Sequence, residues 1–120
     1  MQTIWQNSNF KLIRHESELP WVKLFTNKPY KELSHLSKVL KLEMFELIEK
    51  IEIVMIEIYK PDKINIASFG NMLPHIHWHI ISRFQNDPYF PKTTWEKAIR
   101  ESNLNLPPFE NFIKRVNEVL

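Results

Sequence analysis

Apolar and polar residues alternate along KINIASF (63–69) and again along HIHWHIISRF (75–84). A period of two is typical of a strand with one buried face, because successive side chains point to opposite sides. In the second stretch Ile76, Trp78 and Ile80 would face the core, and the three histidines that alternate with them would share the other face. The pattern therefore predicts two strands, the second of which carries a row of imidazoles.

Two segments near the start of the chain, FKLIRHES (10–17) and WVKLFT (21–26), carry apolar, aromatic and β-branched residues. The Leu19-Pro20 junction separates them, so they predict two strands that form an antiparallel pair. NKPY (27–30) then predicts a turn, because proline is excluded from the interior of a central strand.

A helical pattern replaces the alternation from Leu33 to Lys60. Ser34 and Ser37 are both suitable N-caps, and Pro61 would end the helix. The apolar positions recur every three or four residues, at Leu36, Leu40, Met44, Leu47, Ile51, Val54 and Ile58. The spacing predicts one long helix with a continuous apolar face.

The remainder of the chain predicts a turn over NDPYFP (86–91) and two short helices. One covers 93–100, where a threonine and Glu96 suit a capping box, and the other covers 107–120, with prolines in its first turn. The elements together predict an α+β domain over 1–120, with an antiparallel sheet, one long helix across a face and short C-terminal helices. A sheet this small leaves an edge with which a second copy could pair.

Composition narrows the classes of function. The absence of cysteine excludes disulfides, thiolate metal sites and thiol nucleophiles. The formal net charge of +2 is too small to suggest nucleic-acid binding, but it is compatible with a local site for a small anion. The first residues lack the pattern of a signal peptide, and no stretch is apolar enough to span a membrane. We therefore expect a cytoplasmic protein that binds neither nucleic acid nor membrane.

Two kinds of chemistry suit His75, His77 and His79. The first is a metal site, because histidines two apart on a strand can share a zinc ion. At a rise of about 3.3 Å per residue, however, the outer two Cα atoms would lie about 13 Å apart. No carboxylate follows the cluster until Asp87. One ion held by all three histidines would be strained, and a site made of two would need a ligand from elsewhere.

The second kind is chemistry on phosphorus. A neutral imidazole nitrogen is a good nucleophile at neutral pH, and the phosphorus–nitrogen bond that it forms can be hydrolysed afterwards. A neighbouring imidazole can donate a proton to the leaving group, and a third can orient the other two. Backbone amides near Gly70, the sole glycine, could approach a phosphate closely.

The motif HIHWHII (75–81) resembles the signature of the histidine triad (HIT) family, which is His, apolar, His, apolar, His and two apolar residues. The resemblance extends upstream through INIASFGNMLP and downstream through RFQNDPYFP to Trp95, while LPWVKLFTNK resembles the family's preceding strand. The segment 64–95 is similar to the bacterial diadenosine polyphosphate hydrolase-like branch. Membership implies a nucleotide hydrolase or transferase, usually a homodimer whose two sheets join into one.

The resemblance also implies roles for the three histidines. His77 would attack the α-phosphate of a purine nucleotide derivative and form a nucleotidyl-histidine intermediate. His79 would contact the leaving atom and assist its protonation, and His75 would orient His77. Candidate substrates are dinucleoside polyphosphates, nucleoside phosphoramidates and aminoacyl adenylates. No cofactor is required, although a divalent metal ion could accompany a polyphosphate.

Four further residues are candidate substrate contacts. Asn71 falls where the family places a polar residue near the phosphate, next to Gly70. Asn65 lies where an amide that contacts phosphate or ribose is common. Arg83, four residues after the last histidine, is expected on the same face, where it would either attract a polyphosphate or remain a solvated residue at the strand end.

The chain departs from the family pattern at two positions. Many HIT enzymes carry a fourth histidine where this chain has Trp21, and Ser82 replaces a common proline. His15 and His35 do not align with the missing histidine, so the departure at Trp21 bears on the proton network. Two alternatives therefore stand beside the hydrolase: a HIT module that binds nucleotide with negligible turnover, and a zinc protein that uses the histidine cluster.

Overall fold

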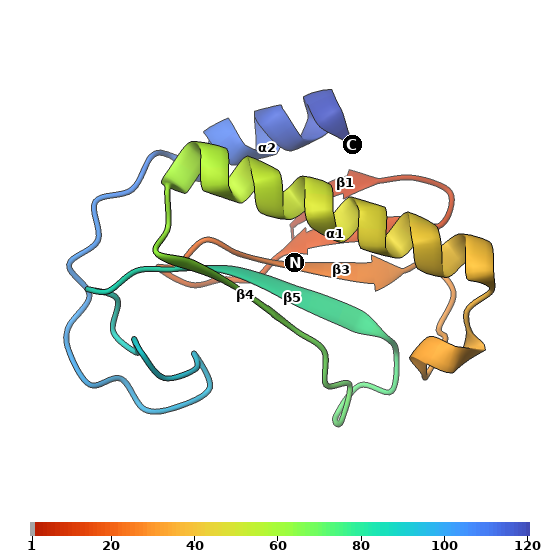
Figure 1. Cartoon of the computed structure of the whole chain (residues 1–120), viewed down its shortest axis with the longest axis horizontal. Helices are drawn as coiled ribbons and strands as arrows, with labels where there is room; N and C mark the ends of the chain where they lie inside the picture. The colour runs from red at the N-terminus through yellow and green to blue at the C-terminus, as the bar shows by residue number, and fades with distance from the viewer. Residues whose placement is uncertain (1) are drawn as a thin grey trace.

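The computed structural model describes residues 2–120 and contains a five-stranded antiparallel sheet with the strand order β1-β2-β3-β5-β4 (Figure 1). In chain order the elements are β1 (Thr3–Gln6), β2 (Phe10–Arg14), β3 (Trp21–Thr26), a 3-10 turn η1 (Leu33–His35), α1 (Lys38–Tyr59), β4 (Lys63–Ala67), β5 (His77–Arg83) and α2 (Phe109–Val119). The predicted α+β class and the antiparallel pairing of the segments that form β2 and β3 are confirmed.

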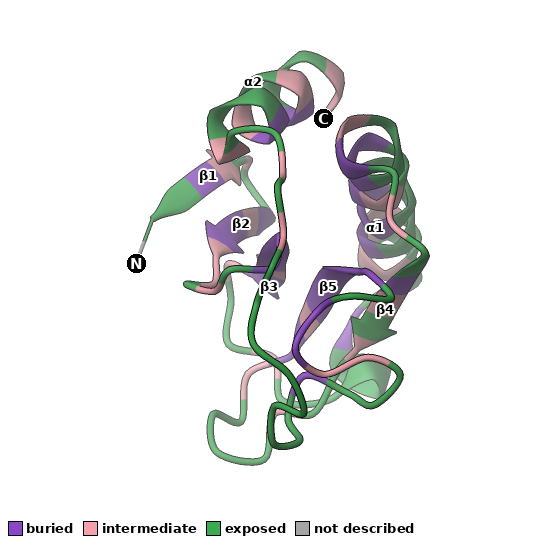
Figure 2. Ribbon diagram, turned by 90° about the vertical axis from the view of Figure 1, so that its left-hand side faces the viewer, coloured by how far each residue is buried: buried purple, intermediate pink, exposed green. Residues whose placement is uncertain are grey.

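The long helix α1 lies across one face of the sheet, and α2 packs beside it and against β1 (Figures 1 and 2). Ser37 begins α1 by accepting a hydrogen bond from the Leu40 amide at 3.2 Å. Lys60 ends the helix in a left-handed conformation, with φ of 49°. The predicted helix is thus confirmed, except that its first residues form η1. No helix in residues 2–120 has the length and apolar content needed to cross a membrane.

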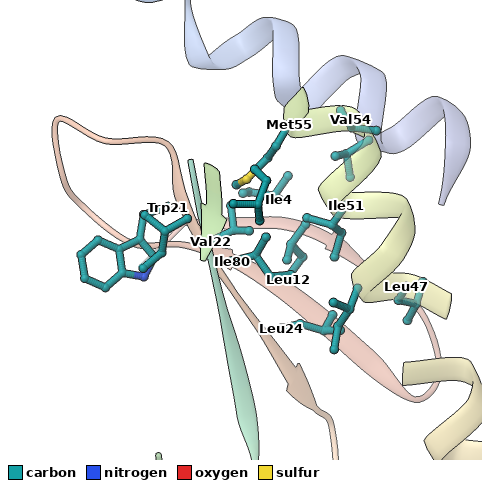
Figure 3. Close-up of a cluster of buried hydrophobic side chains, with 14 of the residues drawn as sticks. Ile4, Leu12, Trp21, Val22, Leu24, Leu47, Ile51, Val54, Met55 and Ile80 are labelled. Atoms are coloured by element: carbon teal, nitrogen blue, oxygen red, sulfur yellow. The ribbon is translucent and has the colours of Figure 1, made fainter. Parts of the chain in front are cut away.

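The helix α1 covers one face of the sheet and leaves the other uncovered. Residues directly opposite each other on paired strands share a face, and Val22 on β3 is opposite Ile80 on β5. Both are fully buried beneath α1, within the core cluster of Figure 3. Trp21, the neighbour of Val22, projects to the other side of the sheet. The two-sided arrangement of side chains is therefore confirmed, and His77 and His79 lie on the face that α1 leaves uncovered, although both are themselves buried.

The connection from β5 to α2, residues 84–108, contains no regular element, so the predicted helix over 93–100 is wrong. A helix of that length is marginal by itself, and tertiary contacts hold the segment in another conformation. Arg100 donates to the carbonyls of Asp87 and Phe90 at 2.6 and 2.9 Å. Asp87 in turn accepts hydrogen bonds from three nearby backbone amides. The segment thereby reaches the free face of the sheet.

Candidate active site

The free face of the sheet carries a pocket of about 640 Å³, a volume in the range of small-ligand sites. Side chains from β3 and β5, the segment that follows β4 and the segment that follows β5 converge on it. Most are apolar or aromatic, and none is acidic. They are Lys23, Phe25, Phe69, Gly70, Asn71, Met72, Leu73, His77, His79, Thr93 and Trp95.

His77 presents a nucleophilic nitrogen to this pocket. Its Nδ1 lies 2.8 Å from the main-chain carbonyl oxygen of His75. A carbonyl can only accept, so Nδ1 carries the proton and Nε2 keeps its lone pair. Phe25, directly opposite on β3, stacks on the imidazole with ring centroids 4.6 Å apart and planes 17° apart. The ring is therefore fixed in both tautomer and orientation.

His79 has the opposite tautomer. The indole Nε1–H of Trp21 donates to His79 Nδ1 at 3.0 Å in a buried contact. An indole N–H can only donate, so Nδ1 is unprotonated and the neutral ring carries its proton on Nε2. Burial, reinforced by the charges of His77, Lys23 and His15, lowers the pKa of His79 to about 4. At neutral pH this ring is an uncharged hydrogen-bond donor.

His75 lies just before β5 rather than within it, and its ring does not line the pocket. Its Nε2 is 2.7 Å from the carbonyl oxygen of Thr26 and 3.1 Å from the Thr26 hydroxyl oxygen. These contacts anchor the imidazole to the end of β3. The contact between His75 and His77 is made by the carbonyl oxygen of His75, not by its imidazole.

Gly70 and Asn71 line the pocket at the turn between β4 and β5. Gly70 has φ of +71°, a left-handed conformation that side-chain-bearing residues rarely adopt. A Cβ at this position would lie 3.4 Å from the Leu73 carbonyl oxygen, an ordinary contact, so the backbone conformation rather than crowding favours glycine. The sole glycine thus allows the turn that brings Asn71 to the pocket rim.

Arg83 and Asn65 lie outside the pocket lining. The Arg83 side chain is only 2% exposed, so the expectation of a solvated strand-end residue is wrong. It forms a two-pronged ion pair with Asp87, at 2.8 and 3.2 Å, and donates to Asn65 Oδ1 and the Lys92 carbonyl at 2.7 Å. Burial raises the pKa of Asp87, but hydrogen bonds from Arg83 and from backbone amides outweigh it and lower that pKa. The hydrogen bonds of Arg83 thus join β4 and β5 to the loop that follows β5.

The candidate residues chosen from the sequence did not include Lys23 or Trp95, which both line the pocket. Lys23 is directly opposite His79 on the neighbouring strand and is the only lysine or arginine among the residues that line the pocket. Trp95 approaches both His79 and Phe69, with ring centroids 5.0 and 4.8 Å apart. The available signal was a lysine interrupting the apolar run WVKLF, which places a charge on the free face.

The geometry gives no support to a metal centre. Within residues 2–120, no three histidine, aspartate or glutamate side chains are placed to hold a metal ion. The Nδ1 atoms of His77 and His79 also have protein partners, the His75 carbonyl and the Trp21 indole.

Solved structures share this fold along nearly the whole chain. A histidine triad protein from Bradyrhizobium japonicum is 26% identical, with a TM-score of 0.80 over 98% of this chain and 88% of that one. A histidine triad protein from Sinorhizobium meliloti 1021 is 22% identical, with a TM-score of 0.78 and the same coverage. One from Marinobacter aquaeolei VT8 is also 22% identical, with a TM-score of 0.76 over 98% and 85% of the two chains.

A comparison with curated protein sequences gives no match. Residues 5–86, however, match the family model described as HIT domain, and this range includes β2 to β5 and all three histidines of the motif. The match covers more than half of the sequence and agrees with the fold and the site geometry. The chain therefore belongs to the HIT domain family.

Proposed function

We propose that the protein is a nucleotide hydrolase of the HIT type. It binds a purine nucleotide derivative, either a dinucleoside polyphosphate or a nucleoside phosphoramidate, and cleaves it at the α-phosphate. The observation that carries this proposal is the tautomer of His77: its Nδ1–H is bound to a carbonyl, and its Nε2 lone pair is available at the pocket. Family membership supports nucleotide binding or hydrolysis in general.

The reaction follows from the tautomer of His77. The Nε2 lone pair of His77 attacks the α-phosphorus, a phosphorus–nitrogen bond forms, and the bond to the leaving group breaks with its electron pair on the leaving atom. His77 keeps its Nδ1–H, and the His75 carbonyl stabilises the positive charge that develops on the ring. Water then attacks the phosphorus, the phosphorus–nitrogen electron pair returns to Nε2, and the nucleoside monophosphate leaves as the water proton passes to solvent.

The pocket walls suit the other parts of such a substrate. Phe69 and Trp95 offer aromatic surfaces on which a purine can stack. Gly70 and Asn71 provide backbone and amide groups at the rim, and Lys23 provides a positive charge beside the histidines. These contacts require no cofactor. A divalent metal ion would enter only as a companion of a polyphosphate.

We also propose that the protein acts as a homodimer. β4 is an edge of the sheet, and Ile66 on it is 41% exposed. Phe45 of α1 is exposed as well and packs edge-on against the half-buried Trp78, with ring centroids 5.8 Å apart. An open strand edge bordered by apolar side chains suits pairing with the same edge of a second copy.

Intact-protein mass spectrometry tests the hydrolase directly. The full chain is mixed with diadenosine tetraphosphate or an adenosine phosphoramidate, alongside His77→Ala, His77→Gly and the surface control His35→Ala. We expect a nucleotidyl adduct or steady nucleotide release that both His77 variants lose and the control retains, because His35 is exposed in η1.

Two outcomes would contradict the proposal. Release that continues unchanged in the His77 variants would mean that another group is the nucleophile. Nucleotide binding with neither adduct nor turnover would identify a binding module instead.

A further inference from the structure

The hydrogen bond between Trp21 and His79 limits what His79 can do to a leaving group. Trp21 is 6% exposed and is held by His15, whose ring stacks on the indole with centroids 3.9 Å apart. The indole N–H donates a hydrogen bond to Nδ1 of His79 and cannot accept one from it. Trp21 therefore cannot serve as the partner in a proton relay that runs through Nδ1 and Nε2 of His79.

The surroundings of His79 also disfavour a second proton on the ring. His77 and His15 lie within ring-centroid distances of 5.1 and 6.5 Å, and Lys23 is directly across the strand pair. The apolar rings of Phe69 and Trp95 also lie close, with centroids 6.2 and 5.0 Å from that of His79. No acidic residue lines the pocket to balance an added charge. His79 consequently donates a hydrogen bond from Nε2 without being a ready source of a transferable proton.

The need for a proton depends on what leaves. A phosphate or carboxylate departs as a stable anion when its bond to phosphorus breaks, so a hydrogen bond and a nearby positive charge suffice. An amine must receive a proton as the phosphorus–nitrogen bond breaks, because an amide anion is far too basic to leave unaided. Lys23, opposite His79, supplies the positive charge that suits the anionic case.

We propose that the site selects substrates whose leaving group departs as an anion, namely phosphoanhydrides and mixed carboxylic–phosphoric anhydrides, over phosphoramidates. Trp21 is the positioning residue that sets this preference by holding His79 as its Nε2–H tautomer. The proposal rests on the proposed function, because it concerns the bond broken when His77 attacks. It narrows the two substrate classes named above to the anhydride class.

The first measurement needs no substrate and therefore does not depend on the proposed function. Long-range nitrogen–proton NMR correlations report which ring nitrogen of each histidine carries the proton. Near neutral pH we expect His79 protonated on Nε2 and His77 on Nδ1. In Trp21→Phe the indole donor is lost while a ring remains, so His79 should show both tautomers. A charged or Nδ1-protonated His79 in the unaltered protein would overturn the proposal.

The second measurement compares kcat/KM for diadenosine tetraphosphate with that for an adenosine phosphoramidate of an alkyl amine. General acid catalysis contributes about 10²–10⁴-fold where it operates, so we expect a preference of at least about 100-fold for the anhydride. Trp21→His places a group that can accept as well as donate next to Nδ1, so the preference should fall by about tenfold or more.

Trp5→Phe is the matched control, because Trp5 is a half-buried tryptophan of β1 outside the pocket. It should change neither the tautomers nor the substrate preference. Equal turnover of the two substrates, or a preference that Trp21→His leaves unchanged, would overturn the inference while the hydrolase function stands. No turnover of either substrate would overturn both.

Discussion

Replacing Arg83 with methionine distinguishes a residue that holds the fold from one that holds the substrate. Its spacing from His79 in the sequence offers Arg83 as a polyphosphate contact, whereas the structure buries it against Asp87. Methionine has a similar length but no charge and no hydrogen-bond donors. In Arg83→Met the Asp87 carboxylate would stay in a fully buried position without its ionic partner.

The expected size of the effect follows from the contacts that are lost. Removing one partner of a buried ion pair costs about 3–5 kcal/mol, because the other charge stays desolvated. Asp87 would keep three backbone amide donors, from Phe84, Tyr89 and Phe90, which places the expected loss near the lower end, at about 3 kcal/mol. Against a typical total of about 5–15 kcal/mol, this is a large share of the stability.

Urea unfolding followed by tryptophan fluorescence and circular dichroism measures this loss. Arg115→Met is the matched control, since Arg115 forms an exposed ion pair with Glu57 at 3.0 Å. An exposed pair contributes only about 0–1 kcal/mol, so the control should stay close to the unaltered protein. If Arg83→Met kept its stability within about 1 kcal/mol but lost nucleotide affinity, Arg83 would be a substrate contact and the structural assignment would be refuted.

Two further predictions concern pH and assembly. Burial lowers the pKa of His79 to about 4 in the folded protein. As pH falls below about 6.5, the unfolded chain therefore takes up a proton on this imidazole before the folded chain does. The free energy of unfolding should drop by about 3 kcal/mol between roughly pH 6.5 and pH 4. Urea titrations across this range should show a smaller drop in His79→Gln, and an equal drop there would contradict the assignment. The second prediction concerns the dimer. Ile66→Lys should turn a dimer into a monomer in light scattering at micromolar concentration. Ile99→Lys should not, because this exposed isoleucine lies in a loop and not on the β4 edge. A monomeric unaltered protein would count against the dimer.

Local periodicity was sufficient to predict most of the sheet and the long helix. The alternation over 75–84 predicts a strand, which the structure has as β5, although β5 is buried on both faces rather than one, and the spacing along α1 buries one stripe of side chains. The pattern failed where segments are short. β1 has four residues and is stabilised by pairing with β2, and this contact cannot be predicted from the sequence of β1 alone.

The predicted helix over 93–100 failed for a related reason. Its capping residues and apolar spacing are compatible with a helix, but Trp95 lies against His79 and the side chain of Arg100 binds two carbonyls of the loop. Those contacts join residues that are 10 or more positions apart in the sequence, so the pattern within a short segment does not show them. Tertiary contacts therefore override a weak local preference.

The histidine motif located the candidate site, but the motif could not give the tautomers. These depend on partners from other strands and from the backbone: the His75 carbonyl for His77 and the Trp21 indole for His79. Lys23 likewise becomes a pocket residue only through the register of β3 against β5, which places it opposite His79. Register is a property of two strands together, so a single strand's sequence leaves it open.

The departure at Trp21 has a narrower consequence than the loss of a histidine suggests. An imidazole at this position could donate a hydrogen bond to His79 or accept one from it, whereas the indole can only donate. The hydrogen bond to Nδ1 is present and holds the His79 ring in one orientation. What the chain lacks at Trp21 is an acceptor, and only steps that move a proton through His79 need one. The substitution should therefore alter which leaving groups are released and leave attack by His77 intact.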